Sequence, residues 1–546
     1  MKYSLLSQKA YGEQVAGTST LLPTGLDPYA GPWELPQVTH LLRRLMFGAR
    51  VEDAAYFLGK SRAEAVYELL HPQGNDPPVP VNDYNNGEEK DPDVAWGESW
   101  LDAPYNDEVE GARIWSLKSW WTGNIIEQDR SILEKMTVFW HNHTPVQFYS
   151  VFNARRNYDY LMKLRHAALG SFKEMIVLLT LDPAMLLYLN GQYNSAGAPD
   201  ENYARELQEL FCIGKGPNAG FTEEDVQAAA RVLTGWRFNW ETNESYFAFW
   251  DHDTGDKQFS SFYGNQLIKG GSGEEGAKEL EALLGMIFNT EECTLFICRK
   301  IYRFFVHHEI DETTEEFVIE PLADIFRNND YQILPILETL FNSEHFFDAA
   351  NRGALLKSPL DYNIGMIREF GNPIPDRSML RDRYQYSGAV LWMGAIQQQS
   401  VGDPPNVSGW PAYYQVPVFD KAWITTDSLP RRAQIADWQL WAGVATDNTQ
   451  VPLDILGTVA KLPNADDPNA LIDILADWQL GIDLNDPLRA RLKSILLSGQ
   501  ISDYYWSTAW LEFVNDPENE MKRQTVYNRL LAFFYTFLHQ EEYQLS

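Results

Sequence analysis

The clearest folding signal in this chain is residues 201–236, ENYARELQELFCIGKGPNAGFTEEDVQAAARVLTGW. Thr222 followed by Asp225 three residues later is the pattern of a capping box, which begins a helix. The acidic residues 223–225 would lie at the positive end of that helix dipole. The Ala run at 228–230 leaves room for another helix to pack closely. The segment therefore predicts two consecutive helices.

Helical periodicity extends from this segment over most of the chain. It runs back to residue 114, returns over about 276–370 and continues after 428 to the end. No strand–helix alternation is present, so the pattern excludes a doubly wound sheet or an α/β barrel. Residues 238–265 alternate aromatic with polar residues, which predicts a small β-hairpin. The expected fold is mainly α: one large multi-helix body with long loops and a minor β-hairpin.

The sequence also suggests how the chain is divided. Residues 1–430 are expected to form the main helical body, and residues 431–546 a C-terminal helical region packed on it. Three inserted loops, at about 72–96, 240–270 and 400–428, are rich in turn-forming or aromatic residues and lack a helical period.

The composition limits the partners of the chain. Its 546 residues include 44 basic and 76 acidic side chains, a net charge of −32. A nucleic-acid-binding protein needs a basic surface and an anionic membrane repels an acidic protein, so neither is expected as a partner. The longest apolar stretch, 175–189, contains Asp182 and Pro183 and is too short to span a membrane.

The N-terminus and the cysteines bear on the compartment. Residues 1–14 contain no apolar run long enough for a secretory signal, so the sequence as written predicts a cytoplasmic protein. Export stays open if a leader has been removed. The three cysteines, Cys212, Cys293 and Cys298, cannot form a disulfide framework and are expected to be buried free thiols.

Two of the ten histidines, His141 and His143, lie within three positions. On a helix such residues point about 200° apart, but Pro145 disfavours helical geometry just before it and predicts a helix end near Asn142. Beyond that end, in extended chain, the two imidazoles share a face. They are therefore candidate metal ligands. The alternatives are that they cap the helix end or act in acid–base chemistry without a metal.

A second polar cluster is WDHDTGDK at 250–257. Asp251 and Asp253 share a face in extended chain and suit a hard cation. We take Asp251 and His252 as candidate metal ligands and Asp253 as a candidate catalytic residue. A solvated turn explains the segment without a metal.

The helix at 201–212 carries two carboxylates one turn apart, Glu206 and Glu209. Such a pair either bridges a metal or divides acid and base roles, and the alternative is a surface helix with ion pairs such as Arg205–Glu209. Arg231, on the Ala-rich face of the next helix, is either held by a buried acid or binds an anion. Glu206 and Arg231 join Asp253 as catalytic candidates.

The loop 404–428, PPNVSGWPAYYQVPVFDKAWITTDS, carries several aromatic residues beside Asn and Asp. Sugar rings stack on such surfaces, so Trp410, Tyr413 and Trp423 are candidate glycan-binding residues. The same aromatics equally serve to pin a long loop to the core, and pinning is the better-supported interpretation.

Nine segments of the chain together resemble one family. They are HLLRRLMFGA (40–49), FWHNH (139–143), DPAMLLYLNG (182–191), the segment 201–236, HDTGDK (252–257), CRKIYRFFV (298–306), LKSPLDY (356–362), PPNVSGWP (404–411) and EEYQLS (541–546). In this order, and over nearly the whole chain, they resemble the bacterial family catalogued as domain of unknown function 1800.

The resemblance implies a bacterial source but no established activity. It also implies frequent pairing with a second family, domain of unknown function 1501, whose members are similar to sulfatase-like hydrolases. Members often carry an acidic residue where this chain has Asn190, so a carboxylate role at that position is absent or moved.

These features favour a metal-assisted hydrolase or oxidase that acts on a polymer such as a polysaccharide. The site would lie at the helix ends of His141, His143 and Glu206. The loops of His252 and Trp410 would cover it. A divalent or transition metal ion held there would activate water, with an acidic residue as general base. The alternative is a non-catalytic scaffold or binding subunit for the sulfatase-like partner.

Overall fold

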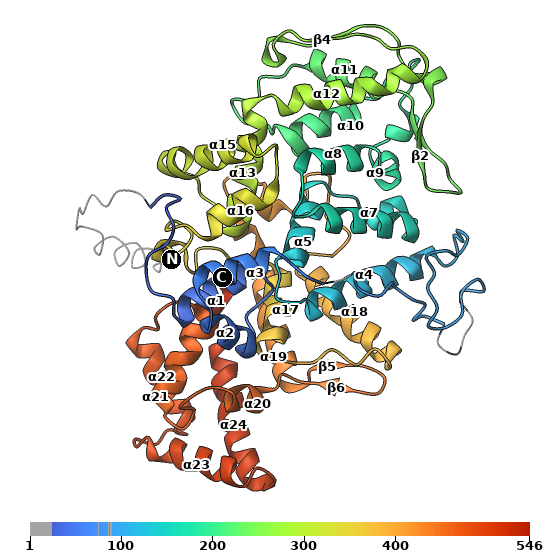
Figure 1. Cartoon of the computed structure of the whole chain (residues 1–546). Coiled ribbons are helices and arrows are strands. Elements are labelled where there is room, and N and C mark those ends of the chain that lie inside the picture. The colour runs from blue at the N-terminus through green and yellow to red at the C-terminus, as the bar shows by residue number, and fades with distance from the viewer. Residues whose placement is uncertain (1–23, 75, 86, 88–89) are drawn as a thin grey trace, which may run out of the picture.

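The computed structural model describes residues 24–74, 76–85, 87 and 90–546 (Figure 1). The fold is mainly helical, as predicted, and the strands of the described residues form only two-stranded antiparallel sheets. None of the described helices is long and apolar enough to cross a membrane. Residues 1–14, on which the expectation about a secretory signal rests, lie outside the described residues.

The helices of the first half are α1 (Leu35–Leu45), α2 (Val51–Leu58), α3 (Arg62–Leu70), α4 (Glu110–Glu127), α5 (Leu133–His143), α6 (Phe148–Val151), α7 (Ala154–Ala167), α8 (Phe172–Thr180), α9 (Pro183–Tyr188), α10 (Glu201–Glu206) and α11 (Glu223–Val232). Those of the second half are α12 (Glu279–Phe288), α13 (Glu291–Phe305), α14 (Glu312–Thr314), α15 (Glu320–Asn328), α16 (Ile333–Phe341), α17 (Pro359–Glu369), α18 (Leu380–Ile396), α19 (Ser428–Trp441), α20 (Ile455–Ala460), α21 (Pro468–Leu475), α22 (Asp486–Leu496), α23 (Tyr504–Asn515) and α24 (Glu520–Phe537).

The predicted capping box begins α11. The backbone N–H of Asp225 donates to the Thr222 hydroxyl (3.3 Å), and the backbone N–H of Thr222 donates to the Asp225 carboxylate (2.7 Å). The three alanines at 228–230 are buried, and α11 packs against α10 and α12. The helix before it does not run regularly, because α10 passes into a π-helical segment, Leu207–Cys212.

The aromatic–polar segment forms the predicted hairpin. Strands β1 (Trp236–Phe238) and β2 (Ser245–Phe247) pair antiparallel, with Trp236 opposite Phe247. A second, shorter pair that was not predicted, β3 (Lys257–Gln258) with β4 (Leu267–Ile268), begins within the segment and ends just beyond it. A third pair, β5 (Val444–Ala445) with β6 (Gln450–Val451), lies near the C-terminal helices and was also missed.

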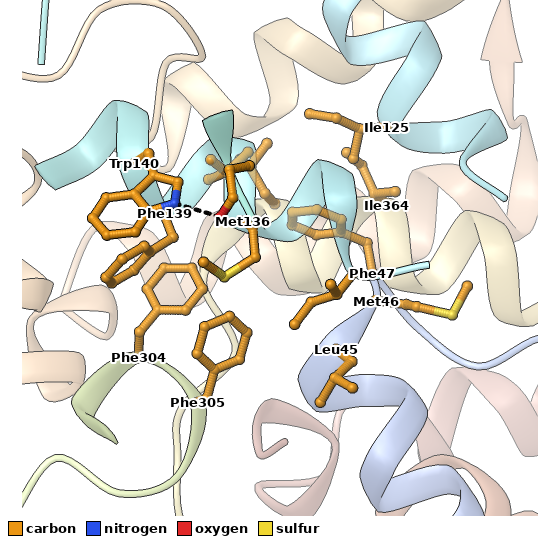
Figure 2. Packing of buried hydrophobic residues seen from close by; sticks show 14 of the residues in the cluster. Leu45, Met46, Phe47, Ile125, Met136, Phe139, Trp140, Phe304, Phe305 and Ile364 are labelled. Atoms are coloured by element: carbon orange, nitrogen blue, oxygen red, sulfur yellow. Dashed lines mark hydrogen bonds between the residues drawn. The ribbon is translucent and has the colours of Figure 1, made fainter. Parts of the chain in front are cut away.

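The centre of the core joins segments that are far apart in the sequence (Figure 2). Phe139 of α5 contacts Phe304 and Phe305 at the end of α13, with ring centroids 5.1 and 6.2 Å apart. Met46 follows α1, and Ile364 lies on α17. All five side chains are buried, so α1, α5, α13 and α17 enclose one continuous apolar interior.

The C-terminal helices pack on the first helix of the chain. The indole N–H of Trp478 donates to the backbone oxygen of Ala49 (2.8 Å), and the hydroxyl of Thr39 donates to the backbone oxygen of Asp477 (3.1 Å). These contacts agree with packing of residues 431–546 on the body, while the boundary at residue 430 stays a prediction. The three cysteines are buried free thiols, as expected.

Candidate functional site

Helix α5 keeps the two adjacent histidines apart. The helix continues through His143, one residue past the predicted end, so the imidazoles point about 200° away from each other. His141 packs against Trp121 and Trp410, with centroid distances of 5.2 and 6.1 Å. His143 instead donates from Nε2 to the backbone oxygen of Phe211 (2.9 Å). The expectation that they converge on one ion is therefore wrong.

Both imidazoles are fully buried and held neutral. Burial, together with the charge of Lys118 for His141 and of Lys300 for His143, lowers the pKa of each to about 3. Neither ring nitrogen of His141 makes a hydrogen bond, although the backbone of Val146 is close enough to favour its charged form slightly. The partner of His143 lies in the segment Leu207–Cys212 and not at the end of α5, so the helix-capping alternative is not supported, while neither ring nitrogen of His141 has a hydrogen-bond partner.

The other two proposed metal ligands are already engaged by protein groups. The ring nitrogens of His252 face the backbone oxygen of Thr234 (2.9 Å) and Oε1 of Glu279 (3.1 Å). Asp251 forms an ion pair with Arg237. Neither residue lies in the ring contacts of His141 or His143. Among the described residues, no three His, Cys, Asp or Glu side chains form a group that could hold a metal ion.

Arg231 and Asp253 bind each other. Nε and Nη2 of Arg231 donate to the two carboxylate oxygens at 2.7 and 3.0 Å. These bonds lower the pKa of Asp253, which makes it a weak general base. Of the two interpretations of Arg231, the structure shows an arginine held by an acid. The pair fixes the 252–257 turn, and the catalytic assignment to these two residues is not supported.

Glu206 has the opposite environment. It stands immediately before the π-helical segment, a distortion that is frequent at functional sites. Its Oε2 is buried and has no hydrogen-bond partner. Burial and then the charge of Glu209 raise the pKa of Glu206. Glu209, one turn later, is instead paired with Lys215 (2.6 Å). Of the two carboxylates predicted to divide acid and base roles, Glu209 thus has an ion-pair partner, whereas Oε2 of Glu206 has no hydrogen-bond partner.

A second carboxylate reaches the same region from the 400–428 loop. Burial, then the charges of Asp403 and Glu206, raise the pKa of Tyr188 to about 12, so both carboxylates act electrostatically on that hydroxyl. Asp403 is bound by the ammonium of Lys118 and by the backbone N–H of Tyr149 (3.1 Å). The ring of Tyr149, 42% exposed, packs on the same ammonium at 5.0 Å.

The aromatic loop is pinned to the core. Trp410 and Trp423 are only 1% and 4% exposed. The backbone N–H of Trp410 donates to Oδ1 of Asn142 (2.8 Å), and Gly409, at φ +85°, lies so close to Asn142 that a Cβ would clash. The ring of Tyr413 packs on Phe304 at 4.9 Å. A sugar therefore cannot stack on these rings while the loop keeps this conformation.

Sequence reasoning brought Glu206, the helix end and the Trp410 loop into one region, but it missed Lys118, Tyr188 and Asp403. Tyr188 and Asp403 lie inside or directly beside segments quoted above. No periodicity marks them, because tertiary packing alone makes them neighbours.

The comparisons agree with the resemblance seen in the sequence. The family described as protein of unknown function (DUF1800) matches residues 40–545. The chain belongs to the DUF1800 family. No curated protein and no solved structure matches it. The match includes every candidate residue of this DUF1800 chain but brings no activity with it.

Substitution of Trp410 distinguishes the two interpretations of the aromatic loop. We expect Trp410→Ala to destabilise the protein by about 3–5 kcal/mol, because a buried Trp leaves a large cavity. Melting temperature and retention on an insoluble polysaccharide are measured together. Trp441→Ala, which removes an indole that is 71% exposed, is the control. A Trp410→Ala variant that melts like the wild type but loses retention would contradict the pinning.

His141 makes the protein sensitive to acid. Its pKa is lowered from 6.5 to about 3 in the folded state, so between these values the unfolded chain binds a proton that the folded chain does not. The contribution of His141 to the free energy of unfolding is therefore fully present above pH 6.5. It falls toward pH 3 with a slope of about 1.4 kcal/mol per pH unit. We expect His141→Phe to flatten this slope in urea titrations between pH 6.5 and 4.5.

The control for that titration is a histidine at the surface. His166 is exposed, and His166→Gln should leave the pH dependence of stability close to that of the wild type. Parallel curves for His141→Phe and the wild type would mean that His141 does not carry the effect.

Proposed function

We propose that this DUF1800 protein hydrolyses glycosidic bonds in a polysaccharide, with Glu206 as the general acid. The observation that carries the proposal is the buried, unpartnered Oε2 of Glu206 together with its raised pKa. A carboxylic acid in such a site stays protonated at higher pH and can donate to a leaving oxygen. Glycosidases use this chemistry with a second carboxylate in a different environment.

Asp403 is the best candidate for the second carboxylate. The charges of Asp403 and Glu206 both act on the Tyr188 hydroxyl, and Lys118 balances the charge of Asp403. In this role Asp403 accepts a proton from the attacking water or attacks the sugar directly, while Tyr188 hydrogen-bonds the substrate. The exposed ring of Tyr149 beside Asp403 offers a surface on which a sugar ring can stack.

The metal-assisted form of the reaction remains a second version of this proposal. His141, with two free ring nitrogens, is the one proposed ligand whose donor atoms have no protein partner. A metal at this place would need further ligands from the solvent or the substrate. Oxidation is less well supported than hydrolysis, because a protonated carboxyl directly supplies what glycosidic bond cleavage requires.

Glu206→Gln tests the proposal. The substitution keeps the volume of the side chain and removes the acid, so we expect the same melting temperature and a loss of turnover of about 100-fold or more. Release of reducing ends is measured on a panel of neutral and sulfated polysaccharides. In the wild type, turnover should fall as pH rises through the raised pKa of Glu206.

Two controls make the result decisive. Glu201→Gln removes a carboxylate from the same helix, where Glu201 pairs with Arg205 at 2.8 Å, and should keep full activity. Elemental analysis of untagged wild type and His141→Phe tests the metal version, which requires about one equivalent in the wild type and none in the variant. A Glu206→Gln variant that cleaves the wild-type substrate at the wild-type rate would end the proposal.

A second candidate function, a binding subunit for the sulfatase-like partner, is favoured by one surface. Apolar side chains are exposed along the length of α23 and at both of its ends: Ile501, Tyr504, Leu511, Val514 and Met521 by 98%, 67%, 47%, 51% and 80%. Exposed apolar clusters of this kind mark protein interaction sites. Figure 1 places α23 at one end of the molecule, with α11 and α12 at the other.

Co-elution tests this second function. If the surface binds a protein of the sulfatase-like family from the same organism, the two purified chains should elute together from a size-exclusion column. The double variant Tyr504→Asp with Met521→Asp should abolish co-elution, since charges oppose burial of the surface. Tyr67→Asp, an equally exposed position on α3, is the control. Undiminished co-elution of the double variant would exclude this surface.

A further inference from the structure

A small cavity lies where α1, α5, α13 and α17 meet the 400–428 loop. Its volume is about 30 Å³, which is room for roughly two or three water molecules. Tyr413 and Trp423 of the loop line it together with Phe304 of α13. Two of the loop aromatics named as candidate glycan-binding residues thus line this cavity.

The cavity is lined by more basic than acidic side chains. Arg43, Arg44, Lys135 and Arg303 supply four cations. The acidic side chains are those of Asp361 and Asp420, and the last residue of the sequence, Ser546, also lines the cavity. Arg43, Arg44 and Lys135 are buried and Arg303 is partly buried, in a chain whose net charge is −32.

The two carboxylates are already engaged. Asp361 forms an ion pair with Lys135 and accepts from the Ser358 hydroxyl (2.8 Å). Asp420 accepts from the backbone N–H of Leu356 (2.8 Å) and lies 3.3 Å from Nδ1 of His308. Neither carboxylate forms an ion pair with an arginine of the cavity.

The arginines keep unused donors. Arg44 is 2% exposed. Its Nη2 donates to the backbone oxygen of Asn351 (2.8 Å), while Nε and Nη1 have no partner. Nε of Arg303 is also buried without a partner, and its guanidinium packs over the ring of Phe419 at 5.0 Å. Burying a guanidinium with unpaired N–H groups lowers the stability of the folded protein unless a hydrogen-bond acceptor is present.

We propose that this cavity binds a small oxyanion, a carboxylate, sulfate or phosphate group, between the guanidinium groups of Arg44 and Arg303. Arginine donates through two parallel N–H groups to such planar or tetrahedral anions. The cavity accommodates one such group and no polymer. The anion would satisfy the free donors and join α1 and α13 to the loop.

The site is distinct from the proposed catalytic one. The hydrolase proposal rests on Glu206, Asp403 and Tyr188, none of which lines the cavity. Anion binding is measured without turnover, so either proposal can fail while the other stands.

The test measures anion binding to the full chain. Protein is first dialysed into chloride buffer at fixed ionic strength. Isothermal titration and thermal shift are then carried out separately with sulfate, phosphate and acetate. We expect saturable binding of at least one of them at a single site, with a rise in melting temperature that follows the occupancy. The strongest of the three identifies the anion class.

Arg303→Gln is the decisive variant, because Arg303 is only partly buried and its loss leaves the Arg44 backbone contact intact. We expect its affinity for the anion to fall at least tenfold, with the melting temperature in chloride unchanged or raised, since an unpaired cation is removed. Arg431→Gln removes an equal charge from the surface, where Arg431 pairs with Asp427 at 2.8 Å, and should bind like the wild type.

Two results would overturn the proposal. One is equal binding by the wild type and Arg303→Gln, which would place the anion elsewhere. The other is no saturable binding of any of the three anions, provided that ion chromatography of the denatured wild type releases no oxyanion carried through purification. Release of one equivalent from the wild type, and of none from Arg303→Gln, supports the proposal directly.

Discussion

Helix α5 is buried on every side, and this constraint organises the centre of the molecule. All residues from Glu134 to His143 are buried, although several are polar. Water cannot solvate them, so other segments must supply partners. Lys135 pairs with Asp361 of α17, Glu134 with Arg165 of α7, and Asn142 accepts from the backbone of the 400–428 loop. One helix thereby fixes elements that are distant in the sequence.

The same rule separates structural from functional polar residues. His252, Arg231 and Asp253 each have well-placed partners and hold one turn against α11. Oε2 of Glu206 and two guanidinium nitrogens of Arg44 are buried without a hydrogen-bond partner instead. Buried groups of this kind cost stability, and functional sites are where proteins sustain such a cost. The proposals for Glu206 and Arg44 rest on these unpartnered atoms rather than on the unusual sequence motifs.

Local signals explain which predictions were confirmed. The helical class, the capping box at Thr222 and the first hairpin depend on residues a few positions apart, and each was predicted from the sequence. The His141–His143 expectation failed for a local reason as well: Pro145 acts on the residue before it, and the helix continues to His143. The π-helical segment has no recognisable sequence pattern and was missed.

What the sequence by itself determined is the mainly helical fold, the free buried cysteines and the family, and it named Glu206 as a candidate. Periodicity, spacing and composition are short-range properties, and they suffice for these. Only the tertiary structure decided that the aromatic loop packs inward, that Asp403 pairs with Lys118, and that four basic residues from three helices line one cavity. These arrangements bring together residues as far apart in the sequence as Arg44 and Asp420. A local sequence pattern does not indicate which distant segments pack together in the limited space around α5.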